Sequence, residues 1–252
     1  MRKRLLPFLA LLAGVGLAQT WTDHRGLTAT FQSLRALTSK SPKRHLSMIG
    51  KVEIVSVPQG LTMRSDTMDI DAVPDPKNPN AYLVQSAQSK GHVSILKQVK
   101  GAKGLQTTKI DGTQADYLAG TVESVIKMTG PVNLVSLDEQ QRQTLAATGK
   151  TATAYMEPAA KTSLDDGLRR AQMDGDVHLT LVQRDAQTKQ ATLIRAYSDH
   201  MLVENIGKGR RVTLTGNVKV FTDSNVELSG IQKAVLTQDA NGVYALHTSE
   251  QP

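Results

Sequence analysis

The 252-residue chain contains no cysteine and few aromatic residues. Without cysteine it has no thiol nucleophile, no thiolate metal site and no disulfide. Aromatic side chains make up only 4% of the residues, so we expect an interior of aliphatic and methionine side chains. Few aromatic rings also leave few platforms on which bases could stack, and the basic residues are scattered. The composition therefore argues against nucleic-acid binding.

Catalytic and metal-binding patterns are missing as well. The sequence contains no G-x-S-x-G turn, no phosphate-binding glycine loop and no dinucleotide fingerprint. Its six histidines form no closely spaced ligand pair, and His92 and His178 fall on the polar face of predicted strands. Asp69, Asp71 and Asp75 could hold a calcium ion, but they lack the EF-hand spacing and a solvated turn is favoured. The sequence therefore predicts no enzyme, no metal site and no cofactor.

One long apolar run is present, at the start of the chain. Arg2, Lys3 and Arg4 precede an apolar stretch from Leu5 to Leu17, which small Ala18 follows. This order predicts a cleavable signal peptide over residues 1–18, because about thirteen apolar residues are too few for a comfortable bilayer span. The alternative is a retained amino-terminal anchor. Cleavage would remove three positive charges and lower the net charge from +7 to a mild +4.

The dominant feature of the remaining sequence is a repeat of about forty residues. Glycine, any residue, valine, any residue and an aliphatic residue recur five times, at spacings of 41, 39, 45 and 41 residues. The glycines are Gly50, Gly91, Gly130, Gly175 and Gly216. Apolar and polar residues alternate around each glycine, which predicts half-buried antiparallel strands. The repeats define a domain over residues 46–252, in which each glycine is expected to bend a strand at a sheet corner.

Other segments do not follow the forty-residue repeat. Residues 19–45 form a polar lead-in, in which Thr28 to Leu37 could be a short helix or a first strand. A loop rich in proline and asparagine is expected from Val73 to Asn80. The stretch from Glu157 to Arg170 lengthens one repeat and is interpreted as a surface helix, a flexible insert or a hinge between two halves. Asn241-Gly242 predicts a closing hairpin.

The residues at the second and fourth positions after each repeat glycine are expected to point toward the interior. If each unit supplies four short strands, two in each of two facing sheets, five units enclose a space about 50 Å long. The aliphatic stripe could be a packed sandwich core. It could also line an unfilled trough for acyl chains, where each buried methylene gains about 0.8 kcal/mol. The candidate lining residues are Val52, Ile54, Val93, Ile95, Val132, Leu134, Val177, Leu179, Val218 and Val220.

The repeated stretches MIGKVEIV, MTGPVNLV, MDGDVHLT and LTGNVKVF resemble the LptA/OstA-like family, part of the LptA/LptC superfamily of periplasmic lipopolysaccharide-transport proteins. The resemblance covers roughly Leu46 to Leu246. It implies an all-β fold, an open and bent β-jellyroll of stacked antiparallel strands, located in the periplasm. It also implies a trough for the acyl chains of lipopolysaccharide, lined by the ten residues above. Edge strands would pair with like domains, itself included, in a bridge toward the outer membrane.

The expected function is therefore the transport of lipopolysaccharide or a related envelope glycolipid, without catalysis. The greater length of the chain, its larger hairpin loops and the 157–170 insert depart from the shorter members of the family, and leave the identity of the lipid open. The alternative is a structural β-scaffold that links envelope proteins edge to edge and binds no lipid.

Overall fold

The computed structural model describes residues 19–22, 27–38, 43–57, 60–76, 78–101, 104–139, 142–156, 168–184, 190–206, 209–223, 227–238 and 243–248. These residues form β-strands and connections, with no α-helix. The strands are β1 (Gln19–Thr22), β2 (Leu27–Phe31), β3 (Ser33–Thr38), β4 (Arg44–Ser56), β5 (Leu61–Asp75), β6 (Asn78–Gly101), β7 (Gly104–Leu118), β8 (Ser124–Asp138), β9 (Gln143–Met156), β10 (Leu168–Arg184), β11 (Ala191–Ile206), β12 (Gly209–Thr222), β13 (Glu227–Gln238) and β14 (Tyr244–Thr248).

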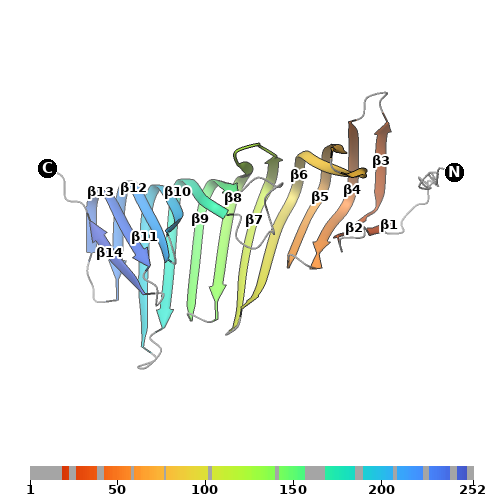
Figure 1. Ribbon diagram of the computed structural model, residues 1–252. Coiled ribbons are helices and arrows are strands. Elements are labelled where there is room, and N and C mark those ends of the chain that lie inside the picture. The colour runs from red at the N-terminus through yellow and green to blue at the C-terminus, as the bar shows by residue number, and fades with distance from the viewer. Residues whose placement is uncertain are drawn as a thin grey trace, which may run out of the picture.

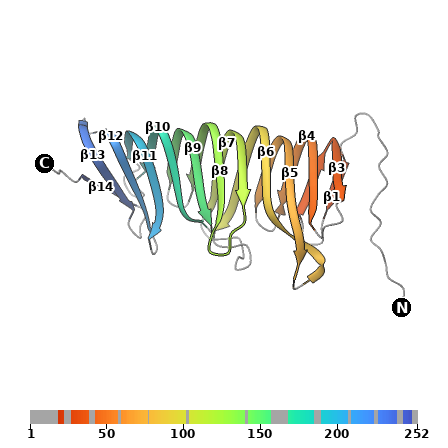
Figure 2. The same cartoon turned by 90° about the horizontal axis from the view of Figure 1, so that it is seen from above.

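All fourteen strands belong to one antiparallel sheet. From β4 onward each strand pairs with the next along the chain, while β2 and β3 pair with different halves of β4. The strands stack along one axis from β1–β3 at one end to β13–β14 at the other (Figures 1 and 2). The sheet is open, because the described strands at its two ends do not pair with each other. The expected open all-β jellyroll built from repeats is confirmed.

The five repeat glycines produce the bend. In β6, Gly91 and His92 lie opposite a single residue of β7, Thr113. Both have left-handed backbones, with φ of +73° and +46°. A two-against-one bulge of this kind bends a strand and increases its twist. The same register shift occurs at the glycines of β4, β8, β10 and β12, so the corners align and fold the sheet into two layers. The first layer holds the halves of these strands before the glycines, and the second layer holds the halves after them.

Each repeat supplies two long strands and not the four short ones expected. The third unit, for example, consists of β8 and β9, which pair with each other on both sides of the corner. The bulge turns the strand without ending its hydrogen bonding, so one strand contributes to both layers.

Of the two alternatives for Thr28 to Leu37, the strand is the one observed, because β2 and β3 each pair with part of β4. A second expectation about an irregular segment is wrong. The loop expected over Val73–Asn80 is largely strand, since β5 runs to Asp75 and β6 begins at Asn78. Pro74 is tolerated there because the hairpin extends past the end of β4, where β5 has no second neighbour in the described sheet. Figure 2 shows this hairpin projecting beyond its neighbours.

The expected insert lies mostly outside the described residues, which omit 157–167; residues 168–170 already belong to β10. β9 and β10 pair along their length, so the sheet is continuous between the two halves. The closing hairpin is present, with Gln238 of β13 opposite Tyr244 of β14. Residues 1–18 are also outside the described part, in which no helix is long and apolar enough to cross a membrane.

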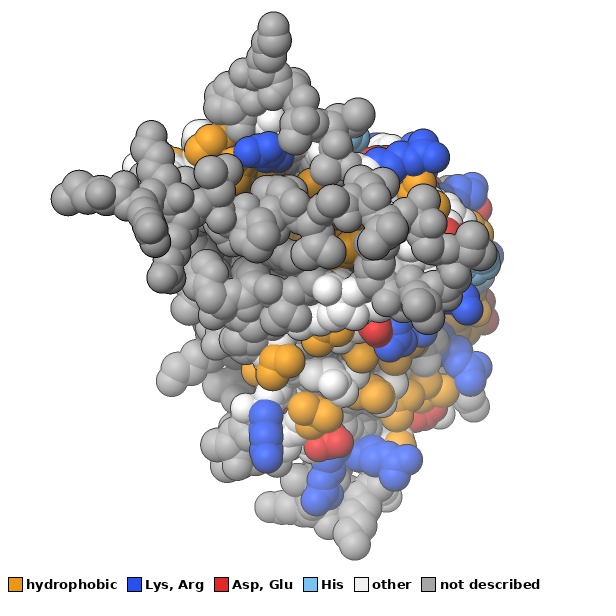
Figure 3. Space-filling view, turned by 90° about the vertical axis from the view of Figure 1, so that its right-hand side faces the viewer, with side chains coloured by type: hydrophobic (Ala, Val, Ile, Leu, Met, Phe, Trp, Pro, Cys, Tyr) orange, Lys and Arg blue, Asp and Glu red, His pale blue; other side chains and the backbone are white. Residues whose placement is uncertain are grey.

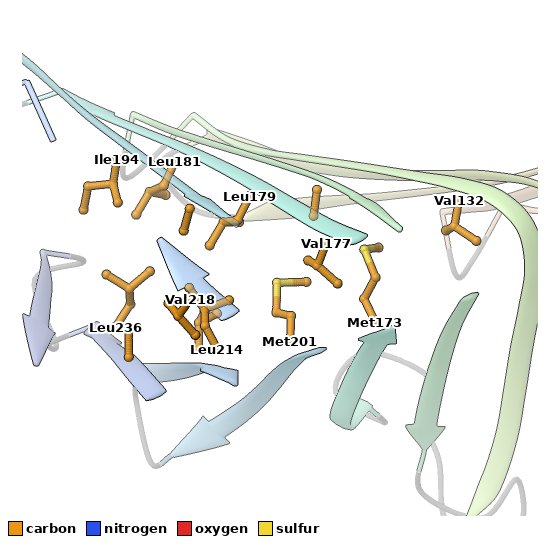
Figure 4. Packing of buried hydrophobic residues seen from close by; sticks show 14 of the residues in the cluster. Val132, Met173, Val177, Leu179, Leu181, Ile194, Met201, Leu214, Val218 and Leu236 are labelled. Atoms are coloured by element: carbon orange, nitrogen blue, oxygen red, sulfur yellow. The ribbon is translucent and has the colours of Figure 1, made fainter. Parts of the chain in front are cut away.

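The core lies between the two layers. Its larger cluster extends from β6 to β13, and a smaller one joins β2, β4 and β5. Figure 4 shows side chains of the larger cluster extending toward one another, Leu179, Leu181 and Ile194 from the second layer and Met201, Leu214 and Leu236 from the first.

Candidate apolar trough

All ten predicted lining residues are buried or partly buried. The residue that comes directly after each bulge is only 0–1% exposed, because it sits at the corner where the two layers meet. These residues are Val52, Val93, Val132, Val177 and Val218. The inward phase read from the sequence therefore matches the burial. A role of these residues as lipid contacts stays a prediction.

Each repeat contributes two of the ten predicted lining residues. The exposure of the second one divides the repeats into two groups. Ile54, Ile95 and Leu134 are only partly buried, whereas Leu179 and Val220 are 1% and 0% exposed. At this position the second layer is therefore partly exposed in the first three units and buried in the last two. The two halves of the interior are not equivalent.

These residues belong to a row that crosses the second layer, one residue per strand, each directly opposite the next. We call it the aliphatic row: Ala29, Ile54, Met63, Ile95, Ile110, Leu134, Ala147, Leu179, Ala196, Val220 and Leu228. Five consecutive members on β4–β8 are partly buried, and we call them the open slot: Ile54, Met63, Ile95, Ile110 and Leu134. At a strand spacing of about 4.8 Å the slot is roughly 20 Å long.

A second row crosses the first layer on the other side of the corner. We call it the methionine row: Leu34, Met48, Met68, Ser89, Ala115, Met128, Ala152, Met173, Met201, Leu214 and Ala234. It contains five of the eight methionines of the chain. Methionine side chains are flexible and polarisable, and adapt to partners of varied shape. An aliphatic surface and an adaptable surface therefore adjoin along the whole corner.

Polar contacts join the two layers where β13 and β14 face β9 and β10. The side chain of Gln238, on β13, donates a hydrogen bond to Gln143 Oε1, on β9, at 2.9 Å, and both residues are buried. The Tyr244 backbone N–H donates to Gln183 Oε1 at 3.2 Å. Burial raises the pKa of the Tyr244 phenol, so its hydroxyl stays protonated in this environment. We call these four residues the seam.

The outer face carries the polar residues. The His92 ring lies 2.9 Å from Asp66, His45 lies 2.8 Å from Asp71, and both pairs join neighbouring strands. The hydrogen bond from His45 lowers the pKa of Asp71. His92 and His178 are exposed, as expected. Within the described ranges no three His, Asp or Glu side chains are grouped to hold a metal ion.

A shallow pocket of about 480 Å³ lies at the corner beside Pro131. Its charged lining residues, Lys150 and Asp176, pair with each other at 2.7 Å. This contact raises the pKa of Lys150 and lowers that of Asp176. Because the two charges neutralise one another, the pocket favours no ligand of one sign.

The sequence pattern pointed to the methionine row only in part. Apolar residues two positions before the glycines were visible, but Met68 and Met201 lie on the return strands and join the row only through cross-strand register. The seam had no local signal, because Gln143 and Gln238 are 95 residues apart.

Comparison with known proteins finds no family model, no curated protein and no solved structure that matches the chain.

Proposed function

We propose that this protein is an exported, periplasmic lipid carrier of the LptA/OstA type. It binds the acyl portion of lipopolysaccharide or a related envelope glycolipid and carries it toward the outer membrane. The observation that supports this most is the open slot, five apolar side chains on adjacent strands that the fold leaves partly exposed beside a buried methionine row.

The energetics of transfer suit such a slot. A buried methylene gains about 0.8 kcal/mol, so ten methylenes offset roughly 8 kcal/mol of the cost of leaving a membrane. Carrying lipid requires no reaction, only an apolar surface that is accessible to the ligand and shielded from water. The slot offers the accessible surface, and the seam closes the interior beyond it.

Free strand edges support the second part of the proposal, a strand-paired bridge. At the amino-terminal end β3 and β1 have unpaired edges within the described sheet, and at the carboxy-terminal end β14 does. Unpaired edges are templates for another strand. Seen from the amino-terminal end, the described surface sets apolar side chains among Lys and Arg side chains (Figure 3). We propose that like domains, including a second copy, pair end to end there.

The alternative function is a scaffold that uses the same edges and binds no lipid. The buried core of the last two units favours it, because a packed interior has no room for a ligand. Lipid binding separates the two proposals.

Cross-linking from the slot tests lipid binding. A photo-crosslinking residue at Leu134 should trap lipid in cells, because this side chain lies within the slot. The same residue at Val135 or His92, on the outer face, should not. Mass spectrometry of the cross-linked protein identifies the adduct. Equal labelling at the three positions, or purified protein that carries no lipid and fails to bind added lipid, would favour the scaffold.

Truncation tests strand pairing. Ending the chain after Ala240 removes β14, and we expect the oligomeric state measured by light scattering to decrease. Ala245→Lys keeps the strand but puts a charge on an exposed position of this edge strand, and should also weaken pairing. Unchanged self-association in both variants would rule out this edge as the interface.

A further inference from the structure

Two buried serines interrupt the apolar interior next to the slot. Ser89 is the only polar residue of the methionine row and is 0% exposed, and Ser65 sits at the neighbouring corner and is 4% exposed. Neither hydroxyl has a hydrogen-bond partner in the described structure. A buried hydroxyl without a partner is costly, so its presence in a native interior requires an explanation.

The other repeats show what these positions hold elsewhere. Ser65 faces Val52 across the strands as Gly112 faces Val93, and Ser89 precedes Gly91 by two residues as Met128 precedes Gly130. In the later units the methionine folds over the glycine. A Cβ on Gly112 would lie 2.6 Å from Met128 Cγ, and one on Gly149 would lie 2.6 Å from Met173 Cγ.

The first corner replaces this apolar contact with two hydroxyl groups. Since glycine and methionine fill the same place twice in this chain, an apolar solution is compatible with the fold. A local departure from the favoured packing is expected where function requires it.

The position of Ser65 relates this departure to the slot. Ser65 follows Met63 by two residues along β5, and Met63 lies in the slot between Ile54 and Ile95. Met63 is partly buried and has a flexible side chain, and side chains two positions apart on a strand face the same way, so Ser65 is on the same face of β5 as the slot. Ser65 therefore lies at the floor of the slot, and Ser89 lies on the adjacent strand.

We infer that Ser65 and Ser89 form a polar subsite that hydrogen-bonds an oxygen atom of a bound acyl chain, either a carbonyl or a chain hydroxyl. This inference rests on the proposed lipid-binding function. A plain hydrocarbon would leave both hydroxyls unpaired, whereas an oxygenated chain satisfies them, so the subsite selects its ligand and fixes its position along the slot.

Ser198 provides a matched control. It faces Val177 at the corner as Ser65 faces Val52, and it is 6% exposed. Its hydroxyl donates to the backbone oxygen of His200 at 2.9 Å. A corner serine can thus be satisfied within the protein, and Ser198 is not available to a ligand in the same way.

The test compares matched probes on the full mature chain. One pair is a long-chain fatty acid with and without a chain hydroxyl, and the other is a fatty-acid methyl ester and an alkane of matched length. In at least one pair, we expect the wild-type protein to prefer the member that carries the chain hydroxyl or the ester carbonyl by about three- to tenfold. The variant Ser65→Ala/Ser89→Ala should lose this preference, and Ser198→Ala should keep it. The pair that shows the preference distinguishes a hydroxyl from a carbonyl.

A second double variant shows whether a lost preference is caused by misfolding. Ser65→Gly/Ser89→Met restores the contact of the later units, and should unfold at the same or a higher temperature while losing the preference. Failure of the wild type to bind any probe would overturn the lipid-carrier function itself. Binding without a preference, or a preference that survives in both double variants, would overturn only the subsite and leave the serines as sites for a buried water.

Discussion

Alanine in place of Gly130 is expected to lower the free energy of unfolding by about 3 kcal/mol, from backbone strain and overpacking together. Gly130 has φ +95°, outside the range that residues with a Cβ adopt readily. The new Cβ would lie 2.9 Å from the Cβ of Thr113, on the opposing strand. Thr113 is β-branched and its hydroxyl donates to the backbone oxygen of Thr129 at 3.0 Å, so it cannot rotate away without losing that bond.

The variant Gly230→Ala separates the contribution of backbone strain from that of overpacking. Gly230 also has a positive φ, +73°, but a Cβ there would meet nothing within 4 Å. We expect this control to cost only the backbone strain, about 1 kcal/mol. Denaturant unfolding of both variants measures the difference. An equal loss in the two would mean that close packing at the corner does not contribute, and that the aligned bulges are tolerated bends without a steric requirement.

This corner is also the part of the fold that the sequence predicted best. Glycine repeated at a fixed phase, with valine two positions later, located the five bends and the inward face. Only local information was needed, because a bulge depends on residues adjacent in the chain. His92 and Asp176, which share the left-handed backbone with their preceding glycines, gave no comparable signal.

Features that depend on pairing between strands were not predictable. The interval around Pro74 looked like a loop because proline and asparagine disfavour strands, yet an edge position removes that penalty. Met68 gave no sign of belonging to a methionine row until its opposite neighbours were known. The exposure of the slot depends on which side chains from elsewhere in the chain pack against it, which no local residue pattern specifies. For that reason Leu134 and Leu179, equivalent in sequence, differ in burial.

Glutamate at Leu134 is expected to reduce the affinity for an acyl chain at least tenfold. Leu134 lies in the slot between Ile110 and Ala147 and is partly buried. An acyl chain in the slot would remove water from the carboxylate without supplying a partner, and burying an unpaired charge is unfavourable by well over the 1.4 kcal/mol that corresponds to a tenfold change. In the unliganded protein the longer side chain can reach solvent, so the free energy of unfolding should fall by only about 1 kcal/mol.

Val135→Glu is the matched control, because Val135 is the next residue on the same strand, faces outward and is 39% exposed. It adds the same charge a few ångströms away, with an expected change in stability within about 0.5 kcal/mol and no change in lipid affinity. Titration of both variants with a fluorescent fatty acid, alongside denaturant unfolding, distinguishes the outcomes. Affinities that remain at the wild-type value in both variants would place the ligand outside the slot. An equal loss of affinity in both variants would indicate a nonspecific effect of charge, and the partly buried residues of β4–β8 would then be the margin of the core and not the site at which the acyl chain binds.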